Sequence, residues 1–240
     1  MGRKTARAWR GRLAAVVLLA ALAGGGWAWW QAQHWAPARA DYPAQGVLVG
    51  AVDGPVDFRS LRAVGANFAY LEASRADQGR DPAFGRNLAA AMAAQMPFGV
   101  VHTYDPCVPE ERQAANFVTI VPRAAEGANN GGAAMLPPVV ALDKLASACG
   151  DPAVEVALEA DLTTFLNQVE GHVGQRAILR LSPAFEERYH LASRIERNLW
   201  LERAWLEPEY AGRPFTLWTA NPALRSEGAE HPLRWVVAQQ

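Results

Sequence analysis

A short apolar strand that ends in a carboxylate is the segment of this sequence best suited to chemistry. Leu136–Asp143 opens with a Pro-Pro pair and closes on Asp143, a pattern typical of a buried strand. In a barrel of parallel strands, catalytic side chains lie at the C-terminal ends of strands. Two carboxyl groups there could hydrolyse a glycosidic bond. Ala141 lies on the same side of the strand as Asp143, so one acid of such a pair is missing.

Other segments follow a family pattern in the same order. They are Gly46–Val49 with Gly54–Phe58, Phe68–Ser74, Gly99–Tyr104, Gln113–Phe117 and Phe215–Trp218. Together with Leu136–Asp143, they resemble the glycoside hydrolase family 25 muramidases, which cut peptidoglycan between N-acetylmuramic acid and N-acetylglucosamine. The resemblance extends over about residues 45–237. It implies an irregular (β/α) barrel, peptidoglycan glycan strands as the ligand, and no cofactor or metal.

Hydrophobic periodicity independently predicts an α/β fold, because short apolar runs alternate with amphipathic helical patterns. Expected strands cover 46–52, 68–73, 98–104, 138–143, 176–181, 199–205 and 215–219, and expected helices cover 57–64, 82–95, 109–121, 152–171 and 183–195. Asp151-Pro152 and Ser182-Pro183 each supply a helix cap followed by an N1 proline. A loop without evident chemistry is expected at 126–134.

The family's acidic positions are mostly lost here. The resemblance places Leu48 at the Asp of the first strand, Ala141 at the Asp of the D-x-E pair, and Arg234 at a late Asp. Only Asp143 stays acidic, at the position of the general-acid Glu, and its side chain is one methylene shorter. Since both retaining and inverting glycosidases need a second group at the anomeric carbon, we expect hydrolysis to be absent or residual.

Five further residues are candidates for substrate binding, each with a structural alternative. Asp53 is either a displaced carboxylate or a turn residue, and Glu72 either faces the ligand or forms an ion pair, for example with Arg75. His102 stands at a family position that points inward, and it is a structural, hydrogen-bonding histidine or else a catalytic one. Tyr104 and Trp218 could stack on sugars or pack in the core.

The N-terminal residues differ in kind from the rest. Residues 1–12 form a basic, cytoplasmic segment, residues 13–30 are an apolar run that could span a membrane, and residues 31–43 read as a polar linker to a domain at 44–240. The positive-inside rule places the domain outside. This predicts a single-pass inner-membrane protein whose domain faces the periplasm. The alternative is a signal peptide cleaved after Ala21-Leu22-Ala23, which exports the domain to the periplasm.

Charge and cysteine content limit the partners. Without the six basic residues of positions 1–40, the chain has 17 Lys and Arg against 24 Asp and Glu, a net charge of −7, which does not favour nucleic-acid binding. Cys107 and Cys149 each follow a predicted strand, so a disulfide would join two loops at the same barrel face. Two free thiols or a metal pair are the alternatives, but partner histidines at ligand spacing are missing.

These observations leave three interpretations. The first is a membrane-anchored domain with a family 25 fold that binds glycan without cutting it. The second is a working muramidase that uses Asp143 as its acid. The third is a protein-interaction domain of the envelope that no longer binds glycan.

Overall fold

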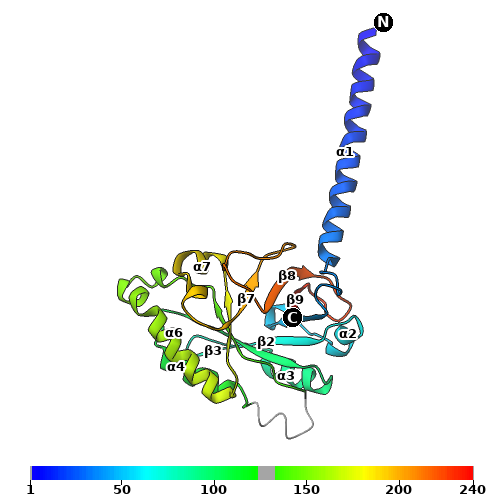
Figure 1. Ribbon diagram of the computed structural model, residues 1–240. Helices are drawn as coiled ribbons and strands as arrows, with labels where there is room; N and C mark the ends of the chain where they lie inside the picture. Colours follow the sequence, from blue (N-terminus) through cyan, green and yellow to red (C-terminus); the bar gives the residue numbers. More distant parts are fainter. Residues whose placement is uncertain (1, 124–132, 240) are drawn as a thin grey trace.

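A closed barrel of eight strands forms the body of the domain, in a computed structural model that describes residues 2–123 and 133–239 (Figure 1). Hydrogen bonding runs β1-β2-β4-β5-β6-β7-β8-β9 and returns from β9 to β1. Only β9 runs antiparallel to its barrel neighbours, which confirms the predicted α/β barrel. The strands are β1 (Ala44–Val49), β2 (Phe68–Arg75), β4 (Phe98–Thr103), β5 (Val139–Leu142), β6 (Ile178–Leu181), β7 (Asn198–Glu202), β8 (Leu217–Leu224) and β9 (Leu233–Ala238), with β3 (Gly79–Arg80) paired to β2.

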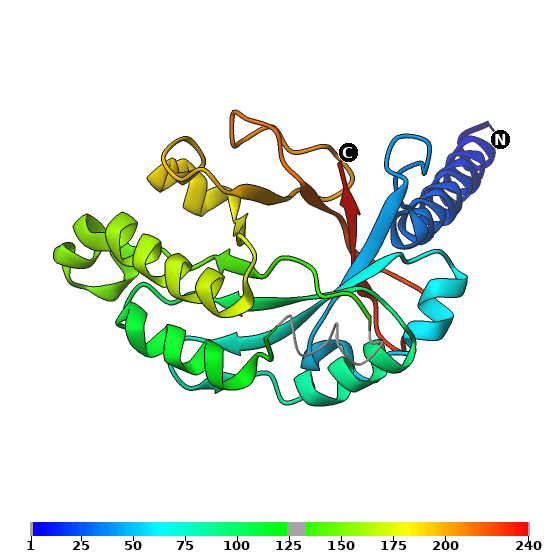
Figure 2. The same cartoon turned by 60° about the horizontal axis from the view of Figure 1, so that its bottom comes forward.

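Helices follow strands β1, β2, β4, β5 and β6 and lie on the outside of the barrel (Figure 2). They are α2 (Phe58–Ala63), α3 (Phe84–Ala93), α4 (Glu110–Ile120), α6 (Pro152–Val173) and α7 (Pro183–Tyr189), with short 3-10 turns η1 (Ala51–Asp53), η2 (Ala146–Cys149) and η3 (Leu191–Ser193). The predicted caps are confirmed: Asp151 accepts from the Ala153 amide at 2.9 Å and Ser182 from the Phe185 amide at 3.3 Å. Such caps satisfy amide groups that the first helical turn leaves unpaired.

Side chains of each strand alternate between the barrel interior and the helix layer. Buried interior residues surround Trp200, which contacts Tyr70 at 5.0 Å between ring centroids. Gly99 leaves room for Tyr70, because a Cβ at that position would overlap its ring. The outer core packs the opposite strand faces against Phe117, Phe165 and Phe185. Both strand faces are therefore apolar, as is typical of parallel strands buried on two sides.

The predicted elements differ from the observed ones at several ends. The helix expected over 183–195 ends at Tyr189, because His190 takes a left-handed conformation with φ 51°. Strand β9 was not predicted at all. The loop expected over 126–134 lies, up to residue 132, outside the described residues.

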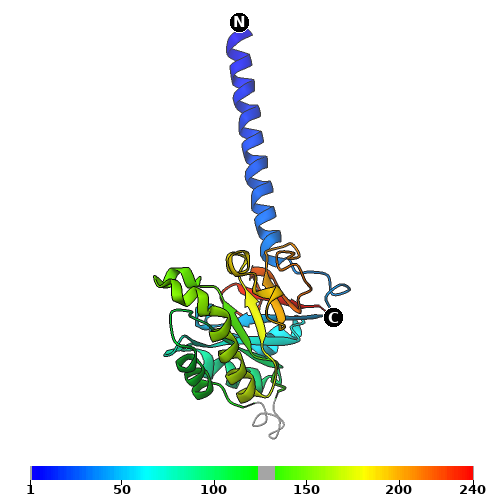
Figure 3. The ribbon, with the colours of Figure 1, turned by 60° about the vertical axis from the view of Figure 1, so that its left-hand side comes forward.

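The N-terminal helix α1 (Gly2–His34) stands away from the barrel (Figures 1 and 3). Its portion Ala15–His34 is long and apolar enough to cross a membrane, a test that signal sequences also pass. The expected linker at 31–43 is not a free spacer. The helix continues to His34, and Trp35 and Tyr42 then pack against Trp218 with ring centroids 6.3 and 5.6 Å apart.

Candidate active site at the barrel mouth

Asp143 lies where β5 ends, at the C-terminal mouth of the barrel, as the sequence predicts. Its Oδ2 atom accepts a hydrogen bond from Nη2 of Arg180 on β6 at 2.9 Å. The side chain of Asp143 is 39% exposed, whereas that of Arg180 is 8% exposed. One oxygen of the predicted general acid is therefore already paired with a buried cation.

Glu202, the last residue of β7, is a second carboxyl group of this mouth. Its Oε1 atom lies 3.7 Å from Nε of Arg180. Burial raises the pKa of Glu202, as does the neighbouring Asp143 carboxylate, while the charges of Arg180 and Arg234 act in the opposite direction. The net effect is a raised pKa for Glu202, because burial disfavours its charged form.

The sequence interpretation missed Glu202, because the Glu202-Arg203 pair reads as an ordinary solvated face. Strand alternation contains the missing signal: Glu202 lies two residues after Trp200, which points into the barrel. Arg180 was also missed, and it follows Ile178 on the inner face in the same way.

Within the described residues, Nε and Nη1 of Arg180 are buried without a hydrogen-bond partner. Its guanidinium lies 6.0 Å from the Trp200 ring centroid.

Arg234 on β9 holds the other side of the mouth. Its Nη1 donates to Glu72 at 2.6 Å and its Nη2 donates to Asp53 at 3.2 Å. Burial opposes the charge of Arg234, but the two carboxylates outweigh this and raise its pKa. Asp53 also accepts from the Gly50 amide at 2.7 Å. Glu72 thus forms an ion pair, with Arg234 as the observed partner in place of the suggested Arg75.

Leu48 and Ala141 lie inside the barrel and are fully buried. Leu48 faces Arg234 across the β1–β9 pairing. Two of the three positions that resemble lost family acids, 48 and 234, are therefore cross-strand neighbours. The three positions carry two apolar side chains and a cation. We define the mouth cluster as the charged residues Asp53, Glu72, Asp143, Arg180, Glu202 and Arg234. It contains four acids and two arginines, which pair as Asp53–Arg234–Glu72 and Asp143–Arg180–Glu202.

A pocket of about 270 Å³ opens beside Glu72. It lies between the end of β2, Thr103 on β4 and the segment Gly79–Pro82. Asp81 in this wall accepts from the Ala51 amide at 2.8 Å and so ties the wall to the loop after β1. Charged side chains in its lining, Glu72, Arg75, Arg80 and Asp81, offer hydrogen-bonding groups to a hydroxylated ligand.

Three predicted binding residues do not face the mouth. His102 and Tyr104 point into the layer between the barrel and α6, where their rings lie 4.8 and 5.3 Å from Phe165. Trp218 points outward to Trp35 and Tyr42, and its Nε1 donates to the Arg203 carbonyl at 2.7 Å. The inward orientation expected for His102 is therefore wrong, and the structural alternatives describe all three residues.

His102 organises the loop after β4 from behind. Its Nδ1 lies 2.8 Å from the Ser74 hydroxyl, and its Nε2 lies 3.4 Å from Oε1 of buried Gln113. Gln113 in turn accepts from the Asp105 amide and donates to the Asp105 and Val108 carbonyls, each at 2.9 Å. Burial lowers the pKa of His102 to about 4. The folded domain therefore holds this histidine neutral.

We expect acid to weaken the fold through His102. Between about pH 6.5 and pH 4, His102 is protonated in the unfolded chain but stays neutral in the folded chain. The contribution of His102 to the free energy of unfolding is therefore present above about pH 6.5 and is lost as the pH falls toward 4. The shift corresponds to about 3 kcal/mol. The measurement is urea unfolding between pH 7 and pH 4 for the natural chain and for His102→Gln. A variant with the same pH slope as the natural chain would contradict this role.

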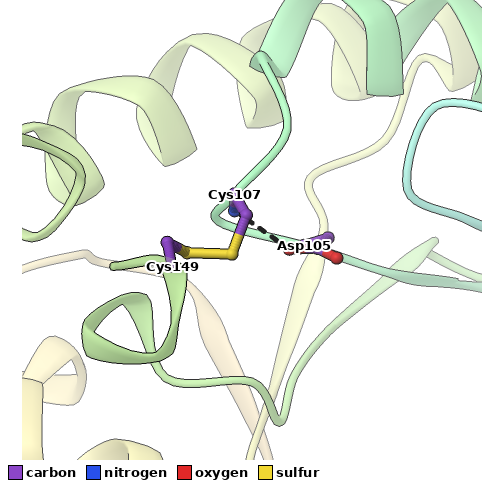
Figure 4. Close-up of side chains that lie close together, drawn as sticks. All are labelled: Asp105, Cys107 and Cys149. Carbon is purple, nitrogen blue, oxygen red and sulfur yellow. Dashed lines mark hydrogen bonds between the residues drawn. A yellow bond between two sulfur atoms is a disulfide. The ribbon is translucent and has the colours of Figure 1, made fainter. Parts of the chain in front are cut away.

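Cys107 and Cys149 form a disulfide, with Cα atoms 5.2 Å apart, as predicted. Figure 4 shows Asp105 beside them, and its Oδ1 accepts from the Cys107 amide at 2.9 Å. Asp105, Cys107 and Cys149 are residue types that can bind a metal ion, and their possible ligand atoms lie close together. However, the sulfurs are bonded to each other, and Lys144 Nζ donates to both oxygens of Asp105 at 2.8 Å. The bond joins the loops after β4 and β5, next to Asp143.

Comparison with known proteins places this geometry in a family. The model of the glycosyl hydrolases family 25 matches residues 49–220. Comparison with the curated proteins gave no match. A family 25 glycosyl hydrolase from Bacillus anthracis superposes with a TM-score of 0.73 at 22% identity, covering 86% of this chain and 92% of that one.

Two further structures share the fold. A bacterial lysozyme from Streptomyces coelicolor has a TM-score of 0.69 at 15% identity, covering 82% of this chain and 92% of that one. A family 25 lysozyme from Aspergillus fumigatus has a TM-score of 0.65 at 16% identity, covering 82% and 94%. The family match covers well over half of the sequence, and the barrel agrees with it. The chain belongs to the glycosyl hydrolases family 25.

Proposed function

We propose that this family 25 domain binds peptidoglycan glycan strands with lost or residual hydrolysis, and that α1 anchors it in the inner membrane with the domain in the periplasm. The observation that carries the loss is Ala141, fully buried in the barrel two residues before Asp143. A methyl group can neither stabilise positive charge at the anomeric carbon nor orient a substrate acetamido group. Both double-displacement and substrate-assisted hydrolysis need a group for those tasks.

The rest of the mouth supports the same conclusion. Leu48 cannot act as an acid, and Arg234 brings positive charge toward a centre that must itself become positive in the transition state. Asp143 is shorter than a glutamate by one methylene, roughly 1–1.5 Å of reach. A displacement of about 1 Å can cost around 10²-fold in rate. The mouth cluster and the pocket beside Glu72 still present donors and acceptors to a sugar.

The membrane part of the proposal is supported by the apolar segment Ala15–His34 behind a basic N-terminus. Trp35 and Tyr42 pack on Trp218 and fasten the end of α1 to the domain, and these contacts would also remain after cleavage behind Ala23. Cleavage would still export the domain.

The test is a sedimentation assay with purified peptidoglycan sacculi, run beside a turbidity assay for lysis. We expect the full chain in mild detergent to pellet with sacculi and to lyse them at least about 10²-fold more slowly than an intact family 25 muramidase. Glu159 is an exposed residue of α6. Its variant Glu159→Gln is the control for the loss of one negative charge outside the mouth cluster. Failure to pellet would favour the protein-interaction alternative.

A working muramidase is the second candidate function, and Glu202 is the observation that favours it. Glu202 and Asp143 flank Arg180, so a second carboxyl group lies beside Asp143, the acid in the sequence-based interpretation. The raised pKa of Glu202 suits this second group to the acid role as well. On this alternative, lysis would be comparable to that of an intact relative. Asp143→Asn and Glu202→Gln would then each abolish it, whereas our proposal expects neither to change the slow background.

A further inference from the structure

The loop after β7 contains two large apolar side chains that the domain leaves uncovered. Trp205 is 49% exposed and Leu206 is 58% exposed. Trp205 has φ 62°, a conformation that bulky residues rarely adopt. The loop is nevertheless fixed, because the Trp205 amide donates to the Ala220 carbonyl at 2.8 Å and Arg203 Nη1 donates to the Glu207 carbonyl at 3.1 Å.

This loop lies against the end of α1. Nε1 of Trp205 is 3.3 Å from the Ala32 carbonyl. Asn221 Nδ2 on β8 donates to the Ala32 and Trp35 carbonyls, both at 2.8 Å, so the helix end is held by the domain. A hollow of about 570 Å³ runs between Trp27 on the helix and Trp205 on the loop. Figure 1 shows the loop on the side of the domain from which α1 leaves.

The height of Trp205 along the helix can be compared with a bilayer. Trp27, Trp29 and Trp30 are all more than half exposed, and such aromatic residues mark the membrane–water interface. Ala32 lies about 3 Å along the axis from Trp30 and about 7.5 Å from Trp27. Since the headgroup layer is roughly 5–7 Å thick on each side, Trp205 is at the level of the headgroups whenever α1 spans the membrane.

We propose that Trp205 and Leu206 insert into the outer headgroup layer of the membrane that α1 spans. The inference rests on the membrane part of the proposed function. Charge is not the attraction, because exposed Arg203 and Arg225 are balanced by exposed Glu207 and Glu227. The contact is therefore aromatic and apolar, and it takes zwitterionic and anionic lipids alike.

Such a contact places the mouth cluster close to the surface of the membrane. Trp205 follows Glu202 by three residues, which span at most about 11 Å of chain. The rim of the barrel is then held beside the lipid surface, together with any glycan bound there. The domain would meet glycan strands close to the membrane and not throughout the envelope.

The test places a fluorescent probe on the loop of the full chain in phosphatidylcholine nanodiscs. Leu206→Cys carries the only free thiol, because Cys107 and Cys149 are bonded. It is labelled with an environment-sensitive fluorophore, and lipids with a nitroxide near the headgroup act as quenchers. The matched control is Val118→Cys, an exposed apolar position on α4. Figure 1 shows α4 on the side of the domain away from α1.

We expect the probe at position 206 to be blue-shifted and to lose most of its emission, while the probe at 118 keeps its emission. Trp205 is partly exposed, and adding Trp205→Ser is expected to reduce the quenching of the probe at position 206. Equal quenching at both positions, or none at either in chains that remain in the discs, overturns the contact. Chains that do not insert into the discs at all refute the anchor itself, which is a separate failure.

Discussion

Arg234→Met is expected to lower the free energy of unfolding by roughly 3–5 kcal/mol, because it leaves two partly buried carboxylates without their cation. Arg234 pairs with Glu72 at 2.6 Å and with Asp53 at 3.2 Å. Its side chain is 22% exposed, so some water reaches the group and the lower end of the range is expected. The measurement is urea unfolding of the full chain in mild detergent.

The control for Arg234→Met is another arginine–aspartate pair that lies at the surface. Arg112 lies 3.4 Å from Asp77, and its side chain is 62% exposed. Arg112→Met should therefore change stability by less than about 1 kcal/mol. Removing the carboxylates as well, with Asp53→Asn and Glu72→Gln beside Arg234→Met, should recover most of the loss. A triple variant as unstable as Arg234→Met would show that packing, and not uncompensated charge, is the cause.

This ion-pair network could not be predicted from the sequence, although its members could be named. Glu72 and Arg234 are 162 residues apart, and only closure of the barrel through β1 brings β2 and β9 together. The family resemblance placed Arg234 at the position of a lost acid. It did not indicate that Arg234 would pair with Glu72 and Asp53. Asp53 and Glu72 both form ion pairs with Arg234, so their role in this fold is structural.

Orientation across the strands was the second thing that the sequence left open. In a strand that is apolar on both faces, the pattern does not tell which face is the interior. The family resemblance places His102 at an inward position, and the apolar pattern alone does not correct this. Val101 is the interior residue of the strand, so His102 and Tyr104 face the helix layer. By contrast, the two helix caps depend on local chemistry alone, and both were predicted correctly.

The disulfide was predictable because it needed only the order of strand ends. Cys107 and Cys149 follow β4 and β5, which are hydrogen-bonded neighbours. Replacing both by serine is expected to destabilise the domain by about 4 kcal/mol, the chain-entropy estimate for a loop of this length; the two residues are 42 positions apart. Urea unfolding of the oxidised natural chain and of the double variant gives the difference.

The two loops are also joined without the disulfide, and this decides how the result is interpreted. Lys144 binds Asp105 at 2.8 Å, but its side chain is 42% exposed, so Lys144→Met should cost less than about 1 kcal/mol. Gln113 holds the Asp105 and Val108 carbonyls from inside. If the double serine variant lost less than about 1 kcal/mol, this buried amide would be what holds the loop beside Asp143. A loss near 4 kcal/mol would instead make the mouth dependent on an oxidising compartment, as expected for an exported domain.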